Sequence, residues 1–133
     1  MSKVAVIDDD ASVRRAFRLL LASAGFEAVV FPSVEAFMES RDRAACDCII
    51  ADLFMPGLTG FDLLKRLQAE GNAPPVVVVT GYSTSANRER AHRLGAKAFF
   101  AKPIDDQALL DAVHWTIEAE IGKKGWRKQT TIC

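Results

Sequence analysis

The chain has 133 residues, of which 50% are hydrophobic and 26% are charged, which is typical of one globular domain and too short for two. Its 17 basic and 17 acidic residues cancel, so no overall charge attracts it to nucleic acid or a membrane surface. No apolar stretch approaches the ~20 residues that span a bilayer, and the start MSKVAVIDDD turns acidic before a signal-peptide core forms. We therefore expect a cytoplasmic protein that neither enters a membrane nor binds specific nucleic-acid sequences through this chain.

The three cysteines, Cys46, Cys48 and Cys133, are an odd number with no second pair to complete a metal site. A cysteine in or beside an apolar run behaves as a small hydrophobic residue. We expect all three to be reduced and structural.

The first half of the chain alternates apolar runs with helical patterns. Strands are predicted at residues 4–7, 27–31 and 48–51. A helix ending at Gly25 is predicted from apolar residues at helical spacing, namely Val13, Phe17, Leu20, Leu21 and Ala24. Ser33 is a suitable N-cap for a short second helix that ends near Ser40.

The second half continues the alternation. Residues 55–60 are rich in turn formers and predict a loop, followed by a helix over 61–70. Four consecutive valines at 76–79 favour a strand buried on both faces. A helix over about 84–94, a strand at 98–101 and a last helix beginning at Asp105 or Asp106 complete the pattern.

Five strands alternating with five helices predict an α/β fold, in which a parallel sheet is covered by helices on both faces. We expect residues 1–121 to form this domain. Residues 122–133 carry four basic side chains and no acid, and we expect them to be a solvated, partly frayed basic tail.

Polar side chains follow four of the five predicted strands. The polar residues are Asp8, Asp9 and Asp10 after the first strand, Asp52 after the third, Thr80 after the fourth and Lys102 after the fifth. Gly81 follows Thr80, and Pro103 follows Lys102. Ligands of such sheets bind beyond the carboxyl ends of the strands. Carboxylates gathered there need a cation, and Mg²⁺ is the natural partner because it prefers oxygen ligands. An aspartate at such a centre can act as a nucleophile and carry an acyl phosphate, beside a lysine that neutralises phosphoryl charge.

Each residue taken alone has a simpler interpretation. The simpler role of Asp10 is to be the N-cap of the first helix and nothing more. The simpler role of Thr80 is that of a hydroxyl residue at the end of a strand. Lys102-Pro103 can be a turn, although proline there raises the chance of a cis bond. The combined arrangement is what favours a functional site.

These motifs resemble the receiver domain of two-component response regulators over residues 3 to 121. The resemblance rests on Val6-Ile7-Asp8-Asp9, Asp52-Leu53-Phe54-Met55-Pro56-Gly57, Val79-Thr80-Gly81 and Phe100-Ala101-Lys102-Pro103. It implies a flavodoxin-like doubly wound sheet of five parallel strands in the order 2-1-3-4-5. It also implies a phosphoacceptor that catalyses its own phosphorylation and dephosphorylation, rather than a turnover enzyme.

The resemblance assigns a role to each site residue. Asp52 is the phosphoacceptor, Asp9 and Asp52 are direct Mg²⁺ ligands, Asp8 acts largely through water, and the Phe54 backbone carbonyl is a further ligand. Lys102 contacts the phosphoryl group and precedes a cis Pro103; Thr80 and Gly81 border the phosphoryl group, and Thr80 and Phe99 are the switch residues. The donor is a phosphohistidine on a sensor histidine kinase or a phosphotransfer protein, or a small acyl phosphate.

One position departs from the commoner family pattern. Phe54, two residues after Asp52, stands where a polar or smaller side chain is usual, and Tyr82 follows Thr80 by two. We hypothesise that these rings shield the acyl phosphate from water and slow dephosphorylation. Gly81, by contrast, leaves the phosphoryl group room to enter.

The resemblance places the output surface on the fourth helix, the fifth strand and the last helix. In the last helix Leu110, Val113 and Ile117 are the expected core stripe. A second apolar stripe of this helix consists of Trp115, Ala112, Ala108 and Ala119. This stripe suits an association surface. The alternative is that the alanines are simply good helix formers and that Trp115 is a single exposed aromatic ring. Arg14, Arg15 and Arg18 either meet an acidic phosphodonor or form a solvated face, and His92 and His114 are expected at the surface.

Four functions remain in competition: a receiver that works alone, the receiver half of a DNA-binding transcriptional regulator, an aspartyl-intermediate hydrolase, and a phosphorylation-independent adaptor. The hydrolase lacks a second acid two residues after Asp52, and the complete acidic set with Thr80 and Lys102 argues against the adaptor.

Overall fold

The structure, a computed structural model, describes the backbone of residues 1–132 and the side chains of residues 1–122. The strands are β1 (Lys3–Ile7), β2 (Glu27–Phe31), β3 (Cys48–Ala51), β4 (Val76–Thr80) and β5 (Ala98–Ala101). The helices are α1 (Ala11–Ser23), α2 (Val34–Glu39), α3 (Gly60–Glu70), α4 (Ser85–Arg93) and α5 (Asp106–Ile132). A short 3₁₀ helix, η1 (Arg41–Ala45), precedes β3 and was not predicted from the sequence.

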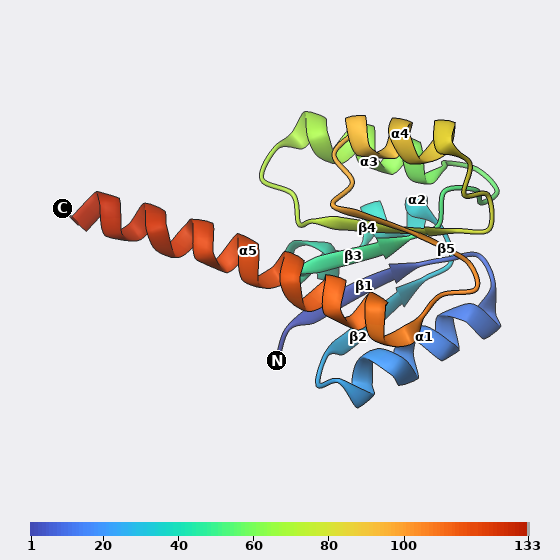
Figure 1. Cartoon of the computed structure of the whole chain (residues 1–133), viewed down its shortest axis with the longest axis horizontal. Helices are drawn as coiled ribbons and strands as arrows, with labels where there is room; N and C mark the ends of the chain where they lie inside the picture. The colour runs from blue at the N-terminus through green and yellow to red at the C-terminus, as the bar shows by residue number, and fades with distance from the viewer. Residues whose placement is uncertain (133) are drawn as a thin grey trace.

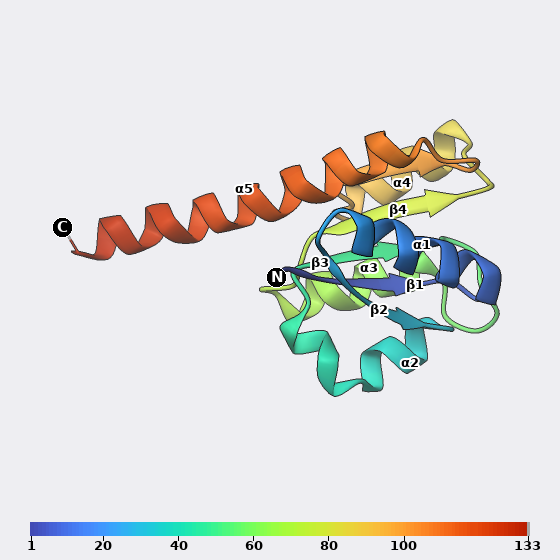
Figure 2. The ribbon, with the colours of Figure 1, turned by 90° about the horizontal axis from the view of Figure 1, so that it is seen from below.

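All five strands are parallel, and the sheet order is β2-β1-β3-β4-β5, as predicted. Helices α1 and α5 cover one face, whereas α2, α3 and α4 cover the other (Figures 1 and 2). The strand arrowheads in Figure 1 all point to the same edge of the sheet, so the loops that follow the strands gather there.

Side chains cap the helices at the positions where backbone N–H groups lack partners. Asp10 accepts hydrogen bonds from the Ser12 and Val13 amides at the start of α1. At the start of α3, Thr59 and Asp62 form a reciprocal capping box, and the hydrogen bonds from Thr59 lower the pKa of Asp62. These caps fix where the helices begin, and so fix the loops between strand and helix.

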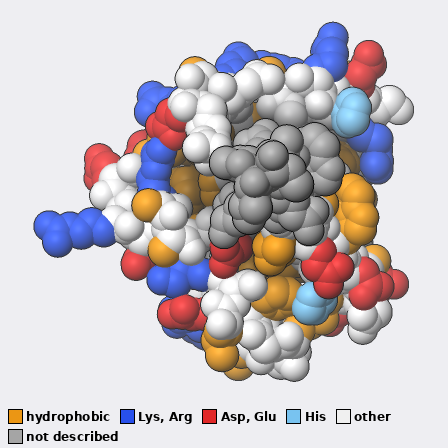
Figure 3. Space-filling model, turned by 90° about the vertical axis from the view of Figure 1, so that its left-hand side faces the viewer, with side chains coloured by type: hydrophobic (Ala, Val, Ile, Leu, Met, Phe, Trp, Pro, Cys, Tyr) orange, Lys and Arg blue, Asp and Glu red, His pale blue; other side chains and the backbone are white. Residues whose placement is uncertain are grey.

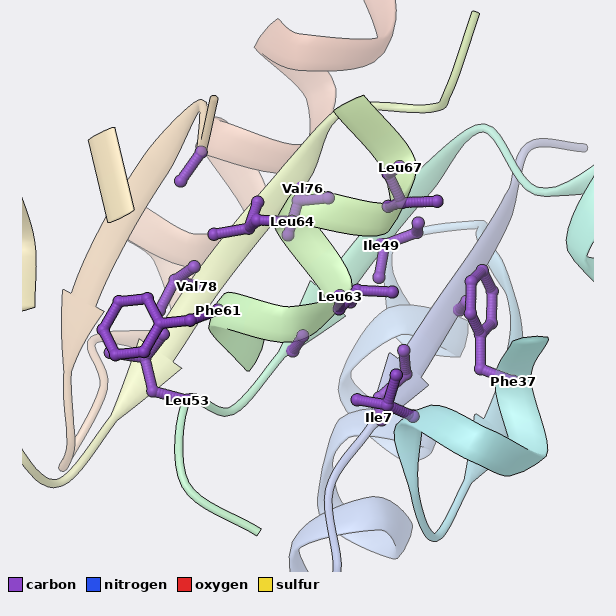
Figure 4. Packing of buried hydrophobic residues seen from close by; sticks show 14 of the residues in the cluster. Ile7, Phe37, Ile49, Leu53, Phe61, Leu63, Leu64, Leu67, Val76 and Val78 are labelled. Atoms are coloured by element: carbon purple, nitrogen blue, oxygen red, sulfur yellow. The ribbon is translucent and has the colours of Figure 1, made fainter. Parts of the chain in front are cut away.

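The core has one apolar cluster on each face of the sheet. Figure 4 shows the larger cluster, where leucines of α3 (Leu63, Leu64 and Leu67) pack against Ile49, Val76 and Val78 of the strands. Every residue of β4 is buried, which explains its run of β-branched side chains. Cys46 and Cys48 are buried free thiols, as expected, and burial raises the pKa of each to about 11.

The last helix differs from the prediction in its buried stripe. Its buried stripe is Leu109, Val113 and Ile117, whereas Leu110 is half-buried and packs against the border of the same cluster. The helix continues to Ile132 and extends away from the sheet (Figures 1 and 2), and the solvated, partly frayed basic tail stays a prediction. The side chains of the expected basic tail, and Cys133, lie outside the described residues.

Within residues 1–132, the helices are either too short or too polar to cross a lipid bilayer.

Gly60 marks the closest approach between the start of α3 and the end of β3. Its N–H donates to the Leu53 carbonyl at 2.8 Å, and a methyl group there would lie 2.5 Å from the Asp52 carbonyl oxygen. Gly60→Ala should therefore lower the free energy of unfolding by about 2 kcal/mol, because backbone must move to admit the methyl group.

Urea denaturation measures the loss, and Gly81→Ala is the matched control because open space surrounds Gly81. The control should stay within about 0.5 kcal/mol of the parent. Equal unfolding midpoints for the two variants would contradict the steric explanation.

Candidate functional site

The strand register brings Asp8 and Asp52 together. Ile7 of β1 pairs with Ala51 of β3, so the residues that follow them leave the sheet at the same level. The Asp52 amide still donates to the Ile7 carbonyl at 3.1 Å. Asp8 is 1% exposed and Asp52 8% exposed. Two carboxylates thus lie side by side in a largely desolvated position at the carboxyl edge of the sheet.

Lys102 bridges these two carboxylates from the opposite side of the site. Thr80 of β4 pairs with Ala101 of β5, and the Lys102 amide donates to the Thr80 carbonyl at 2.8 Å. The Lys102 Nζ lies 3.0 Å from Asp8 Oδ2 and 2.9 Å from Asp52 Oδ2. Burial is the largest influence on the pKa of Lys102 and lowers it, but the hydrogen bonds and charges of Asp52 and Asp8 together raise it above its ordinary value. The lysine is therefore held charged between its partners.

Asp9 completes the acidic cluster. Carboxylate oxygens of Asp8, Asp9 and Asp52 lie within 4.8 Å of one another, with Asp9 exposed and the other two buried. Three carboxylates against one lysine leave an excess of negative charge, and an all-oxygen donor set suits a hard divalent cation such as Mg²⁺. Asp10 points elsewhere and caps α1, so it does not belong to the cluster.

Thr80 is the last residue of β4, and Gly81 follows it at the carboxyl edge of the sheet. Thr80 is fully buried, and its Oγ1 accepts the Tyr82 amide at 3.1 Å, which leaves the hydroxyl proton available for donation. Gly81 is exposed, and open space surrounds its Cα. The Lys102–Pro103 peptide bond is cis, as the family resemblance implies.

Phe99 lies on β5, half-buried, where Val78 of β4 is its strand partner. The Arg88 guanidinium of α4 lies over its ring, 4.8 Å from the centroid. This cation–π contact is invisible in the sequence, because the two residues belong to different elements and no periodicity relates them.

Aromatic side chains line the mouth of the site. The Phe54 ring centroid lies 5.2 Å from that of Tyr82 and 6.0 Å from that of Phe61, in edge-to-face arrangements. Phe54 remains 41% exposed, while its backbone N–H donates to Asp52 Oδ1 at 3.3 Å. The Arg90 guanidinium lies 4.1 Å from the Phe61 centroid, so contacts run from Tyr82 through both phenylalanines to α4.

Arg14 makes a contact that neither interpretation of the three α1 arginines included. It is half-buried, and its Nη1 donates to the Asp8 carbonyl oxygen at 2.8 Å. Arg15 and Arg18 are exposed, as a solvated face requires. The only feature of the sequence that points to this contact is the position of Arg14, which lies one turn into the helix that follows the acidic loop.

The remaining sequence candidates lie away from the acidic cluster, on the helices. His92 and His114 are exposed, as expected, and the His114 ring lies 4.6 Å from that of Phe26. Trp115 is 63% exposed, whereas Ala108 and Ala112 are half-buried. These three residues form a stripe of α5 that no other element covers within residues 1–122.

One cavity in the described part of the chain is remote from this chemistry. It has a volume of about 580 Å³ and lies at the amino-terminal edge of the sheet, lined by residues that include Arg43, Glu70, Pro75 and Ile117. Figure 3 views the molecule from that end, where side chains of both charges surround the hydrophobic ones. The acidic cluster lies elsewhere, at the carboxyl edge of the sheet, with Asp9 exposed and Asp8 and Asp52 buried.

A family model of response regulator receiver domains matches residues 4–114. The transcriptional regulatory protein FixJ of Bradyrhizobium diazoefficiens is 38% identical over 78% of this chain and 51% of its own length. The response regulator protein TodT of Pseudomonas putida is 32% identical over 84% of this chain and 49% of its own. The chain thus spans about half the length of these curated relatives.

Solved structures agree with this similarity. The response regulator StyR superposes with a TM-score of 0.84 at 35% identity, covering 98% of this chain and 66% of its own. Full-length FixJ from B. japonicum superposes with a TM-score of 0.81 at 35% identity, over 88% of this chain and 58% of that one.

Replacing the bridging Lys102 should lower the free energy of unfolding, because Asp8 and Asp52 then repel each other without a cation between them. Lys102→Met leaves the carboxylates of Asp8 and Asp52 buried without their cation, and we expect a loss of about 2 kcal/mol in unfolding free energy without divalent metal. Urea denaturation in EDTA measures it. Lys97→Met, which removes an exposed lysine just before β5, is the control and should change little; equal losses in both variants would contradict the bridge.

Proposed function

The chain belongs to the response regulator receiver domain family, and from that premise we propose that Asp52 is its phosphoacceptor. The observation that carries this proposal is the shared lysine: Asp52 and Asp8 both contact Lys102 Nζ at about 3 Å. Asp52 is the member of this trio that combines a central position, at the end of β3, with slight exposure to solvent.

Mg²⁺ is the proposed cofactor. The residues proposed to hold it are Asp9 and Asp52 directly, Asp8 largely through water, and the Phe54 backbone carbonyl. When bound, Mg²⁺ supplies positive charge that offsets the carboxylates and the incoming phosphoryl oxygens. The mutual proximity of the three carboxylates supports this assignment.

The proposed transfer is a direct displacement on phosphorus. A carboxylate oxygen of Asp52 attacks the phosphoryl group, the O–P bond forms, and the P–N bond of the phosphohistidine donor breaks, with the imidazole leaving with the bonding electrons. Lys102 neutralises phosphoryl charge. The Thr80 hydroxyl donates to a phosphoryl oxygen, and Gly81 leaves space beside it. Hydrolysis of the acyl phosphate resets the domain, so it is a switch rather than a turnover enzyme.

The proposed partners follow from this role. A sensor histidine kinase or phosphotransfer protein supplies the phosphoryl group, in the cytoplasm. Thr80 and Phe99 respond to it and alter the surface of α4, β5 and α5, through which the chain contacts a downstream protein or a second copy of itself. The exposed Trp115, flanked by Ala108 and Ala112, supports α5 as part of that surface.

A second candidate is the receiver half of a DNA-binding transcriptional regulator. It is favoured by the relatives named transcriptional regulatory proteins, of which this chain matches about half. The full length of the gene product discriminates the two candidates, since the chemistry at Asp52 is the same in both.

Incubation with acetyl phosphate and Mg²⁺ should give a single phosphoryl adduct in the intact mass. The adduct should be absent from Asp52→Asn and when EDTA replaces Mg²⁺. Asp105→Asn, an exposed acid after β5, is the matched control and should be phosphorylated like the parent. If the parent gains no adduct and also fails to bind beryllofluoride, the phosphoacceptor proposal is wrong.

The aromatic mouth should slow hydrolysis of the acyl phosphate. Phe54→Asn opens the approach to Asp52, and we expect the phosphorylated variant to lose its phosphoryl group at least about threefold faster, because water reaches the bond more easily. Decay of the adduct after removal of the donor measures the rate. Leu19→Asn removes an exposed apolar side chain of α1 and should leave the rate unchanged; a Phe54→Asn variant that decays no faster than the parent refutes the shielding hypothesis.

A further inference from the structure

Arg14 occupies a distinctive place beside the acidic cluster. It stands in the first turn of α1, and its guanidinium reaches back to donate a hydrogen bond of 2.8 Å to the carbonyl oxygen of Asp8, six positions earlier. The direction is expected, because helical side chains point toward the amino-terminal end of their helix. Its neighbour Arg15 is exposed and takes no part in this contact.

The hydrogen bond acts on the backbone between two acidic residues. The Asp8 side chain is already fixed, since Oδ1 accepts the Asp10 amide at 3.0 Å and Oδ2 contacts Lys102. The Asp8 amide donates to the Phe31 carbonyl at 3.1 Å. The Arg14 contact adds the Asp8 carbonyl oxygen, which belongs to the peptide plane that joins Asp8 to Asp9.

Asp9 depends on this peptide plane more than its neighbours do. Its side chain is exposed, and within residues 1–122 its carboxylate has no hydrogen bond or ion pair that would orient it. Its carboxylate nevertheless belongs to the cluster with Asp8 and Asp52. The orientation of the Asp9 Cα–Cβ bond is therefore set by the backbone, and Arg14 helps to hold that backbone.

We propose that Arg14 is a positioning residue of the metal site, which holds the peptide between Asp8 and Asp9 so that the Asp9 carboxylate faces Asp52. The inference rests on the proposed function, because it concerns the Mg²⁺ ligands named there. Outer partners that orient ligands commonly change metal affinity by about 10- to 100-fold when they are removed.

Arg14 also carries a positive charge, and the two effects have opposite signs. Loss of the hydrogen bond loosens a ligand and weakens Mg²⁺ binding. Loss of a nearby cation removes repulsion and strengthens it. The adjacent Arg15 provides a matched control, because Arg15→Met removes the same charge from the same helix without breaking a contact to the acidic loop. The sign of the change in affinity therefore separates positioning from charge.

The test is Mg²⁺ titration of the full chain by isothermal titration calorimetry. We expect Arg14→Met to raise the Kd for Mg²⁺ about tenfold, Arg15→Met to leave it unchanged or lower it, and Arg14→Lys to recover part of the loss. A second readout is the ¹⁵N resonance of the Asp9 amide without metal, whose nitrogen is bonded to the carbonyl carbon that Arg14 holds. It should shift in Arg14→Met and stay in place in Arg15→Met.

Other outcomes overturn the inference. If Arg14→Met and Arg15→Met bind Mg²⁺ equally, or Arg14→Met binds it more tightly than the parent, Arg14 acts only as a charge and the proposed function stands. If the parent itself does not bind Mg²⁺, the proposed function fails as well. Should Arg14→Met not fold, Arg14→Lys decides: an unchanged Kd and an unshifted Asp9 resonance exclude the positioning role.

Discussion

The site depends on one electrostatic arrangement: two buried carboxylates share a single ammonium group. Asp8 and Asp52 would repel each other at the end of β1 and β3, and Lys102 offsets that repulsion from the end of β5. The parallel register determines this meeting, because it brings Ile7 level with Ala51, and Thr80 level with Ala101. A third carboxylate, Asp9, leaves the balance of charge negative, so the single ammonium group offsets the repulsion only in part.

The elements around this centre differ in how firmly they are packed. Strand β4 is buried throughout and cannot move without disturbing the core. Helix α4, by contrast, buries only Ala91 within its span. Arg88 and Arg90 attach it further, by lying over the rings of Phe99 and Phe61, and such contacts contribute about 0.5–1 kcal/mol each at exposed positions. An element held by weak contacts beside a rigid strand is a suitable part of a two-state switch.

The aromatic residues connect the mouth of the site with that helix. Tyr82 and Phe54 meet at the mouth, Phe54 meets Phe61 of α3, and Arg90 of α4 covers Phe61. The same Phe54 contributes its backbone N–H to Asp52. Phe54 therefore has two kinds of contact: its backbone N–H donates to the Asp52 carboxylate, and its ring belongs to the row of aromatic rings that ends at α4.

The sequence by itself determined the elements of this fold, because apolar periodicity, capping residues and turn-forming glycines are local signals. It also determined which polar residues lie at one edge, because parallel strands share their carboxyl edge. Thr80 ends a strand, and Asp8, Asp9, Asp52 and Lys102 come directly after strands. Only the tertiary structure decided that Lys102 bridges two carboxylates, that Arg14 holds the Asp8 carbonyl and that Arg88 covers Phe99. It also decided the phase of α5, which buries Leu109. The physical reason is that these features depend on the relative placement of separate elements, which packing sets and local propensity does not.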